Sequence, residues 1–203
     1  MRTHTCGELR KKDVTKTVVL EGWAQSRRDH GGVIFIDLRD RYGMSQVVFD
    51  PSHNNTIHKT AEHIGREFVL HVKGKVRDRK EGMINPKMPT GEVEVIVDEL
   101  EILNESETPP MEIDDRVLPN EELRLKYRYI DLRRPSMQEK IILRHNVVQA
   151  TREFLNSKGF LEIETPLLVK PTPEGARDYL VPSRVNPGMM YACRNHPNYT
   201  SRF

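Results

Sequence analysis

The sequence predicts a small barrel of five β-strands, followed by a connector and then by a segment that contains a long helix. In the first hundred residues, apolar and polar side chains alternate in short runs, as they do in strands that bury one face. A polar stretch punctuated by prolines then spans residues 104–120, which is typical of a domain boundary. After Pro135 the apolar residues recur at helical spacing instead.

The predicted strands cover residues 18–24, 33–38, 46–49, 68–77 and 93–98. In the second strand, Ile34, Ile36 and Leu38 fall on one face, whereas Phe35 and Asp37 fall on the other. A helix-like stretch over about residues 56–65 lies between the third and fourth strands. This order is that of the OB-fold, a small Greek-key barrel, although alternation by itself does not separate it from other small barrels.

The second segment is predicted to contain a short helical stretch over residues 121–129 and a longer helix after Pro135. Ser136 and Glu139 have the spacing of a capping box, and Gly159 is placed to end the helix. Residues 160–168 are expected to be extended. The helix has an apolar stripe that consists of Ile141, Val147, Val148, Phe154 and Leu155. We expect too little chain to cover this face, which leaves it sticky, partly disordered or dependent on a partner.

Composition narrows the class of protein. The net charge of +2 gives no global argument for nucleic-acid binding, so any such binding must come from a local cluster of cations. Cys6 and Cys193 are too few and too far apart for a disulfide framework or a zinc site, which fits a reducing compartment. The first residues lack the apolar core of a signal peptide, and no apolar run approaches the ~18 residues that span a bilayer. We therefore expect a cytoplasmic protein without a membrane segment.

Three stretches carry a resemblance to bacterial-type aspartyl-tRNA synthetases. Residues 22–40, GWAQSRRDHGGVIFIDLRD, are similar to the barrel of these enzymes. Residues 124–135, RLKYRYIDLRRP, resemble the hinge of class II synthetases of the Asp, Asn and Lys subgroup. Residues 159–184, GFLEIETPLLVKPTPEGARDYLVPSR, resemble motif 1 followed by the loop that closes over bound aspartate. The last stretch is the most specific of the three, because lysyl and asparaginyl relatives do not share the whole loop.

The resemblance implies a division into domains. Residues 1–104 correspond to an OB-fold anticodon-binding domain, residues 105–135 to a hinge, and residues 136–192 to the start of an α+β class II catalytic domain. Residues 193–203 depart from the family, and we interpret them as a frameshifted tail, because reading one base earlier can restore the family's LPQSPQLYKQI. We therefore expect a truncated chain that lacks motifs 2 and 3.

An OB barrel binds single strands by stacking bases on aromatic rings and by holding phosphates with cations. The resemblance implies that Phe35 stacks on an anticodon base and that Gln46, which both donates and accepts hydrogen bonds, reads the central uridine. Without the resemblance, Phe35 is ordinary packing at the rim and Gln46 an exposed strand residue. The remaining implied anticodon residues are Arg28, Arg77, Arg79 and Glu94, with Arg27 as a further cation. A cationic run of this kind is otherwise a solvated face, and outward glutamates on strands are common.

Four further residues have roles that only the resemblance implies. His30 and Gly82 mark non-discriminating enzymes, which charge both the aspartate and the asparagine tRNAs; the alternative is a turn histidine and a turn glycine. Glu174 pairs with the ammonium group of aspartate, unless it is a solvated turn residue. Pro166 belongs to motif 1, which forms the homodimer interface, although motif 1 can equally pack within one subunit.

The expected function is that of an aspartate–tRNA ligase. The full-length enzyme activates aspartate with ATP and Mg²⁺, and the arginines of motifs 2 and 3 stabilise the pentacoordinate phosphate. Those motifs lie beyond this chain, so we expect it to bind neither ATP nor Mg²⁺ and to catalyse nothing on its own. Two alternatives remain: a free-standing tRNA anticodon-binding module without chemistry, and a general single-strand-binding OB protein.

Overall fold

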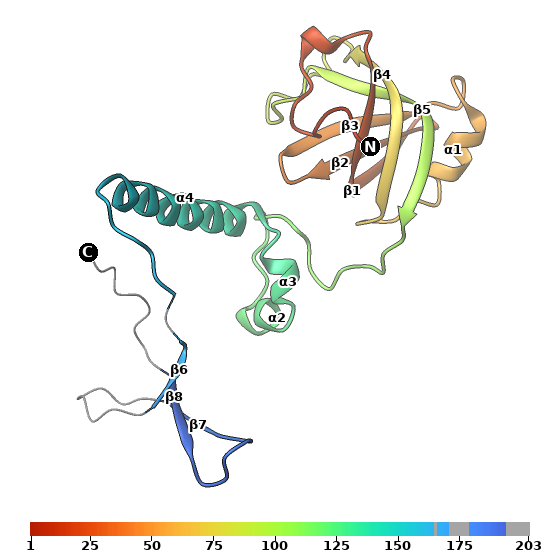
Figure 1. Ribbon diagram of the computed structural model, residues 1–203. Helices are drawn as coiled ribbons and strands as arrows, with labels where there is room; N and C mark the ends of the chain where they lie inside the picture. The colour runs from red at the N-terminus through yellow and green to blue at the C-terminus, as the bar shows by residue number, and fades with distance from the viewer. Residues whose placement is uncertain (165, 171–178, 194–203) are drawn as a thin grey trace. The chain divides into compact units, whose positions relative to one another are not determined.

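The computed structural model describes residues 1–164, 166–170 and 179–193 of the chain (Figure 1). The chain divides into two compact units, Met1–Arg134 and Pro135–Phe203. Glu174 and the predicted tail from residue 194 onward lie outside the described residues. No described helix is long and apolar enough to cross a membrane.

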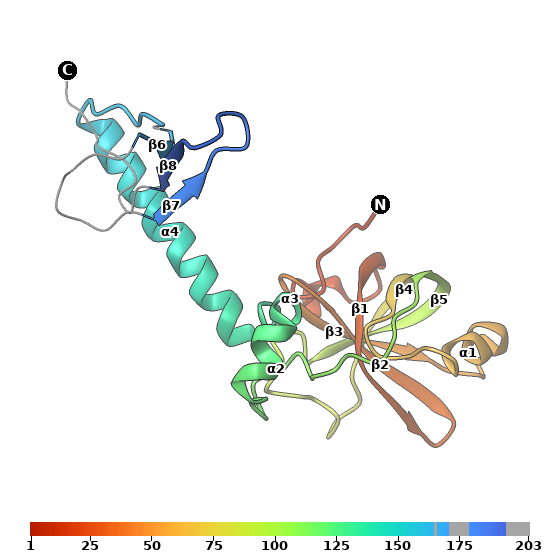
Figure 2. The same cartoon turned by 90° about the horizontal axis from the view of Figure 1, so that it is seen from below.

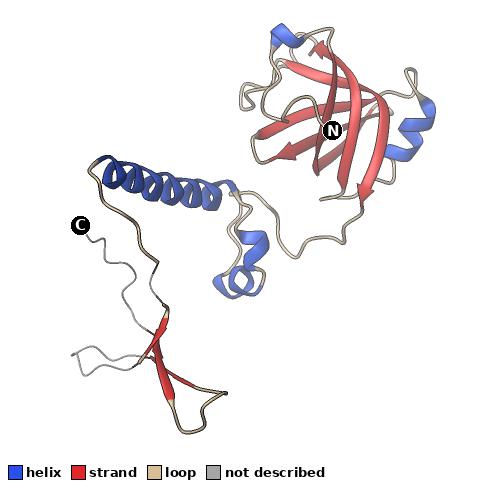
Figure 3. Ribbon diagram, viewed as in Figure 1, coloured by secondary structure: helices blue, strands red, loops and turns tan. Residues whose placement is uncertain are grey.

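The first unit contains a closed five-stranded barrel in the order β1-β2-β3-β5-β4, coloured red in Figure 3. Neighbouring strands are antiparallel, apart from β3 and β5, which pair in parallel and close the barrel. A short 3-10 helix, Lys11–Asp13, precedes β1, and helix α1, Asn55–Ala61, lies between β3 and β4. The strands are β1 Thr17–His30, β2 Val33–Asp40, β3 Gly43–Phe49, β4 Val69–Asp78 and β5 Val93–Asn104. The OB-fold prediction is confirmed.

The barrel core consists of the apolar side chains that alternation assigned to the inner face. Ile34, Ile36 and Leu38 are completely buried, as are Val18 and Leu20 on β1. Burying each side chain of this size contributes roughly 1.5–3 kcal/mol, which is what stabilises so small a barrel. Helix α1 is shorter than predicted and begins after Asn54, whose side chain accepts hydrogen bonds from the backbone N–H groups of Thr56 and Ile57.

The prediction that the first strand ends at Ala24 is wrong, because β1 continues to His30. Gly31 and Gly32 have φ values of 64° and 80°, which suits the tight turn that pairs His30 with Val33. The β1–β2 hairpin therefore projects beyond the rest of the barrel (Figure 2). The register of β1 against β2 shifts between Ala24 and Ser26, so Gln25 is an extra residue in the strand.

The connector after β5 is more ordered than a simple linker. We call residues 105–134 the hinge segment; it includes helices α2, Glu121–Lys126, and α3, Arg128–Asp131. Its own small apolar cluster contains Met111, Ile113 and Ile130, with Leu123 and Tyr127 packed against it. The segment also contacts the barrel. Arg66 donates to Glu112 at 2.6 Å, and the guanidinium of Arg133 lies 5.2 Å from the centre of the Trp23 ring.

The second unit starts with helix α4, Pro135–Ser157. Because the helix begins at Pro135, Ser136 lies inside its first turn and not just before it. Proline suits the first helical position, where no N–H is needed. The helix ends as predicted. Gly159 has a φ of 79°, and the N–H of Phe160 donates to the carbonyl of Leu155, which closes a Schellman motif.

Short strands complete the described part of the second unit. They are β6 Leu168–Val169, β7 Tyr179–Pro182 and β8 Met190–Cys193, and they form an antiparallel sheet in the order β6-β8-β7. The predicted apolar stripe of α4 is largely solvent-exposed in this structure, including Ile141, Val148 and Phe154. Pro166 is exposed as well.

Candidate nucleic-acid interface

The bulge at Gln25 decides which face of the barrel Arg28 occupies. Along β1 the inward residues are Val18, Leu20 and Ala24, and simple alternation from them would point Arg28 inward as well. The extra residue inverts the alternation, because a one-residue shift moves every following side chain to the opposite face. Arg28 consequently pairs with Phe35 of β2 on the outer surface.

Strand register brings the other predicted residues onto the same outer surface. Phe35 pairs with Val48, and Asp37 pairs with Gln46. On the neighbouring strands, Arg77 of β4 pairs with Glu94 of β5. The side chains of Arg28, Phe35, Gln46, Arg77 and Glu94 therefore come from all five strands of the barrel and share one face.

A continuous row of hydrogen bonds links these polar side chains. Nη2 of Arg28 lies 2.9 and 3.0 Å from the two carboxylate oxygens of Asp37, and it also donates to Oε1 of Gln46 at 3.3 Å. In turn, Nε2 of Gln46 donates to Oε2 of Glu94 at 2.8 Å. The row ends at Arg77, whose Nε donates to Oε1 of Glu94, also at 2.8 Å. We call these five residues, Arg28, Asp37, Gln46, Glu94 and Arg77, the polar row.

The two central members of the polar row are buried although they lie on the outer side of the barrel. Gln46 and Glu94 are each only 7 % exposed. A buried carboxylate is stable only when it is paired, and here it accepts one hydrogen bond from the amide and one from the guanidinium. Glu94 therefore points outward, as predicted, but the side chains around it, including Gln46 and Arg77, bury it.

Arg79 occupies a different environment from the other predicted arginines. It is 7 % exposed, and its Nε donates to the carbonyl oxygen of Val93 at 3.1 Å. Burial lowers the pKa of the Arg79 guanidinium, and the negative charges of Glu94 and Asp37 oppose this effect. Within the described part of the chain its Nη2 has no hydrogen-bond partner. A buried donor without a partner costs roughly 1–3 kcal/mol, so an incoming acceptor atom would relieve it.

Phe35 lies beside the polar row and is half-buried. Its neighbours across the strands are Arg28 on one side and Val48 on the other. A ring in this position has one side supported by the barrel and an arginine on the neighbouring strand, which is the arrangement of a stacking platform for a base.

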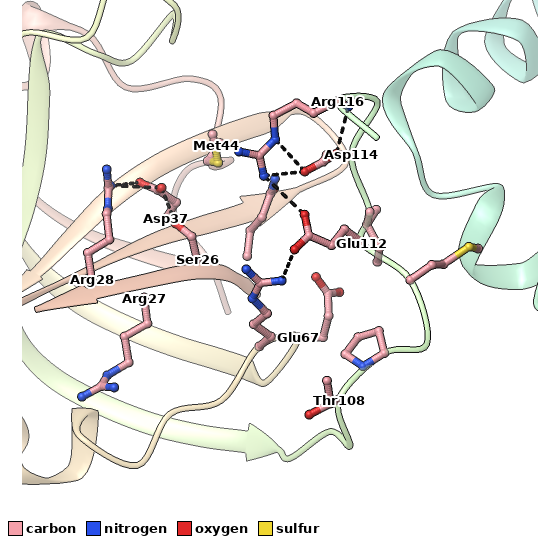
Figure 4. A pocket seen from close by; sticks show the side chains of 15 residues that line it. Ser26, Arg27, Arg28, Asp37, Met44, Glu67, Thr108, Glu112, Asp114 and Arg116 are labelled. Atoms are coloured by element: carbon pink, nitrogen blue, oxygen red, sulfur yellow. Dashed lines mark hydrogen bonds and ion pairs between the residues drawn. The ribbon is translucent and has the colours of Figure 1, made fainter. Parts of the chain in front are cut away.

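Figure 4 shows the end of this surface next to the hinge segment. The hydroxyl of Ser26 donates to Asp37, the same carboxylate that Arg28 contacts. Beside them lies a pocket of about 570 Å³, which is also lined by Arg27, by Arg66 and by hinge residues such as Glu112 and Arg116. Most of its charges are paired with one another, as in the contact of Arg116 with Asp114 at 2.6 Å.

The two residues predicted to govern discrimination between tRNAs belong to different connections of the barrel. His30 is exposed at the end of β1, in the β1–β2 hairpin. Gly82 lies in the loop between β4 and β5 and has a φ of 81°, which favours glycine. A side chain there would meet no atom within 4 Å, so the requirement for glycine comes from the backbone and not from crowding.

Sequence reasoning missed Asp37 and Ser26 as members of this surface. Alternation does place Asp37 on the same face as Phe35, so a search for a carboxylate able to hold an arginine could have found it. No comparable signal exists for the hinge residues that line the pocket in Figure 4, because their contacts with the barrel span long distances in the chain.

Comparisons with known proteins agree with this architecture. The family described as OB-fold nucleic acid binding domain matches residues 18–103, and the family described as tRNA synthetases class II (D, K and N) matches residues 120–199. The chain is 60 % identical over 196 residues to an aspartate–tRNA(Asp/Asn) ligase from Desulfatibacillum aliphaticivorans. It is 58 % identical over 197 residues to the protein of the same name from Protochlamydia amoebophila. Each alignment covers 97 % of this chain and 33 % of the relative, so the chain spans about a third of their length.

Solved structures show the same fold. The asparaginyl-tRNA synthetase from Pyrococcus horikoshii, in complex with asparaginyl-adenylate, superimposes with a TM-score of 0.78 at 25 % identity, over 95 % of this chain and 42 % of that one. A structure from Leishmania major Friedlin, described as an aspartyl-tRNA synthetase, has a TM-score of 0.77 at 22 % identity, over 94 % and 38 % of the two chains. The chain thus matches an OB-fold model in its first part and a class II tRNA synthetase model in its second, and over 97 % of its length it is similar to proteins named aspartate–tRNA(Asp/Asn) ligase.

Proposed function

We propose that this chain supplies the anticodon-reading part of an aspartate–tRNA(Asp/Asn) ligase. The observation that supports this best is the polar row, which joins side chains from all five strands beside the half-buried ring of Phe35. An OB barrel with a supported aromatic ring, flanking cations and a fixed amide combines the elements that bind a single-stranded loop.

Each member of the surface has a proposed role. Phe35 stacks on a base of the anticodon, and Gln46 reads the central uridine with its amide. Arg28, Arg77 and Arg79 attract the phosphate backbone of the RNA. The Nη2 of Arg79, which has no partner among the described residues, offers a donor to a phosphate or a base. Glu94 is a further base-reading position, through its contact with Gln46.

The activity of the whole enzyme is part of the same proposal. It joins aspartate to the tRNA in an ATP-dependent reaction, and Glu174 holds the ammonium group of the amino acid. The ATP and Mg²⁺ of this reaction belong to the whole enzyme; among the described residues there is no group of three or more His, Cys, Asp or Glu side chains placed to hold a metal ion. We further propose a cytoplasmic homodimer with Pro166 at its interface.

His30 and Gly82 support a non-discriminating enzyme that serves the aspartate and asparagine tRNAs. His30 is the last residue of β1 and Gly82 lies in the loop after β4; we assign both to a permissive pocket for the third anticodon base. We also propose the domain division given by the resemblance: residues 1–104 for the anticodon, 105–135 for the hinge, 136–192 for the start of the catalytic domain.

The names of the relatives favour the ligase over both alternatives, the free-standing tRNA anticodon-binding module and the general single-strand-binding protein. The second of these can be tested by binding. It and the ligase are distinguished by sequence preference. We would measure binding of the 203-residue chain to RNA hairpins with the loop anticodon GUC, and to a hairpin of the same stem with a scrambled loop. The proposal predicts tighter binding to GUC; equal binding to both hairpins would overturn it.

Phe35→Ala tests the stacking role in the same assay. We expect this variant to lose affinity for the GUC hairpin by about tenfold or more, since base–aromatic stacking contributes roughly 1–3 kcal/mol. Tyr42→Ala is the matched control, because Tyr42 is an exposed aromatic residue of the barrel that lies outside the polar row. Equal losses in the two variants would indicate non-specific contact with the RNA.

A further inference from the structure

We propose that the polar row is an orientation lock for the amide of Gln46, and that Glu94, Arg28 and Asp37 are positioning residues that decide which base the amide accepts. The inference rests on the proposed function, because it concerns how the same surface selects the central base of the anticodon. It goes beyond that function by assigning the selectivity to the partners of Gln46.

A glutamine amide that is free to rotate can present its donor and its acceptor in either order. Rotation by 180° about its last bond exchanges the donor nitrogen and the acceptor oxygen with little change in shape. A freely turning amide can therefore pair with a base edge that presents a donor beside an acceptor in either order. Uracil and cytosine present these groups in opposite orders, so such an amide would tolerate both.

The partners of Gln46 allow only one of the two orientations. The guanidinium of Arg28 can only donate, and it lies 3.3 Å from Oε1; the carboxylate of Glu94 accepts from Nε2 at 2.8 Å. Turning the amide over would set its nitrogen against the guanidinium and its oxygen against the carboxylate. Both contacts would become repulsive, and Gln46 is too buried for water to replace them.

A second pair of contacts holds the two partners in place. Both carboxylate oxygens of Asp37 accept from Nη2 of Arg28, at 2.9 and 3.0 Å, and the hydroxyl of Ser26 donates to the same carboxylate. On the other side, Arg77 donates to Glu94 at 2.8 Å. Each partner of the amide is thus anchored from a neighbouring strand, and the lock is present before RNA binds.

The lock still leaves the amide able to read a base. It uses one hydrogen of Nε2 and one lone pair of Oε1, so the second hydrogen and the second lone pair remain. A uracil that places a carbonyl oxygen against Nε2 and its N3–H against Oε1 satisfies both. Cytosine in the same pose would put its amino group against Nε2 and its bare N3 against Oε1, and neither contact is favourable.

Glu94→Gln tests this mechanism. The substituted amide keeps the shape of Glu94 but can donate as well as accept, so position 94 no longer opposes the turned amide, and only the longer contact from Arg28, at 3.3 Å, still does. We would measure affinities for hairpins with the anticodons GUC and GCC, using the 203-residue chain and checking the fold by circular dichroism. The unsubstituted chain should prefer the central uridine by about 10- to 100-fold, the usual range for one bidentate contact. In the variant the preference should fall to about threefold or less, because binding to GCC improves.

A purely structural role gives a different result, in which Glu94→Gln weakens binding to both hairpins equally and keeps their ratio; that result would overturn the lock. Asp37→Asn acts on the other end of the row, through Arg28, and should reduce the same ratio in part. Glu101→Gln is the matched control, because Glu101 lies on the same strand, is exposed, and pairs with His71 instead. If the unsubstituted chain binds GUC no better than a scrambled loop, the proposed function fails. If it prefers GUC but Glu94→Gln keeps the ratio, only the lock fails.

Discussion

Asp131 holds the hinge segment together, and replacing it by asparagine is expected to release this segment from the barrel. Asp131 is 0 % exposed, and it accepts hydrogen bonds from Nη1 of Arg128 at 2.5 Å and from Nε of Arg134 at 2.8 Å. Arg134 is itself only 3 % exposed and also contacts Asp115 at 2.6 Å. The substitution keeps the volume of the side chain but leaves two guanidinium groups facing a neutral amide.

The expected cost follows from the burial of these groups. Removing one partner of a buried ion pair costs about 3–5 kcal/mol, because the other charge stays buried without compensation. We take the lower end, about 3 kcal/mol, because Arg134 keeps Asp115 and Arg128 is half exposed. That free-energy change corresponds to about a hundredfold shift from the folded towards the unfolded hinge segment. Once unfolded, the segment no longer holds Arg133 against Trp23. The apolar cluster of the hinge segment has only three buried residues, so it contributes too little stability to compensate for this loss.

The single tryptophan of the chain provides the assay. The ring of Trp23 is close to Arg39 of the barrel and to Arg133 of the hinge segment, whose guanidinium groups lie 5.9 and 5.2 Å from the ring centre. Undocking removes Arg133 and exposes the indole, so Asp131→Asn should shift the emission to longer wavelength and lower the urea midpoint of the fluorescence transition. Circular dichroism of the barrel should change little.

Glu112→Gln is the control for this experiment. The contact of Glu112 with Arg66 joins the hinge segment to the barrel as well, but both side chains are about half exposed. A pair of this kind contributes about 0–1 kcal/mol, so its loss should leave the tryptophan signal almost unchanged. An Asp131→Asn variant whose emission and urea midpoint match those of the unsubstituted chain would refute the reasoning.

Three further predictions concern the barrel. Ile36→Ala should destabilise it by about 2–5 kcal/mol, seen as a lower Tm by circular dichroism, because the side chain is completely buried; an unchanged Tm would contradict the assigned core. Arg79→Met should leave the Tm equal or higher, since it removes a buried donor without a partner, yet weaken binding to the GUC hairpin; unchanged binding would exclude Arg79 from the interface. The hydrogen bond from Lys16 lowers the pKa of Asp13, with burial opposing it. The stability from Asp13 is therefore present above the unfolded carboxyl pKa of about 3.9 and lost as the pH falls through the folded value. In the Asp13→Asn variant, the urea midpoint should lack the part of its decrease at acid pH that comes from Asp13. If the midpoints of the two proteins change in parallel with pH, the prediction is contradicted.

Several features of this protein were determined by the sequence alone, because they depend on residues close together in the chain. Alternation identified Ile34, Ile36 and Leu38 as the inner face of β2, since successive side chains of a strand point to opposite sides. Gly159 marked the end of α4, because the positive φ of a helix terminus favours glycine. These patterns, together with the order of strands and helix, were sufficient for the OB-fold once the resemblance was recognised.

The tertiary structure alone decided how the candidate interface is connected. Hydrogen-bonded partners in the polar row are separated by 9 to 48 residues in the chain, so no local pattern records that they are in contact. Their pairing depends on the bulge at Gln25, which turns Arg28 outward against the alternation of the preceding strand. The burial of Glu94 and the docking of the hinge segment on Trp23 have the same cause, because both arise only when distant strands and helices are packed together.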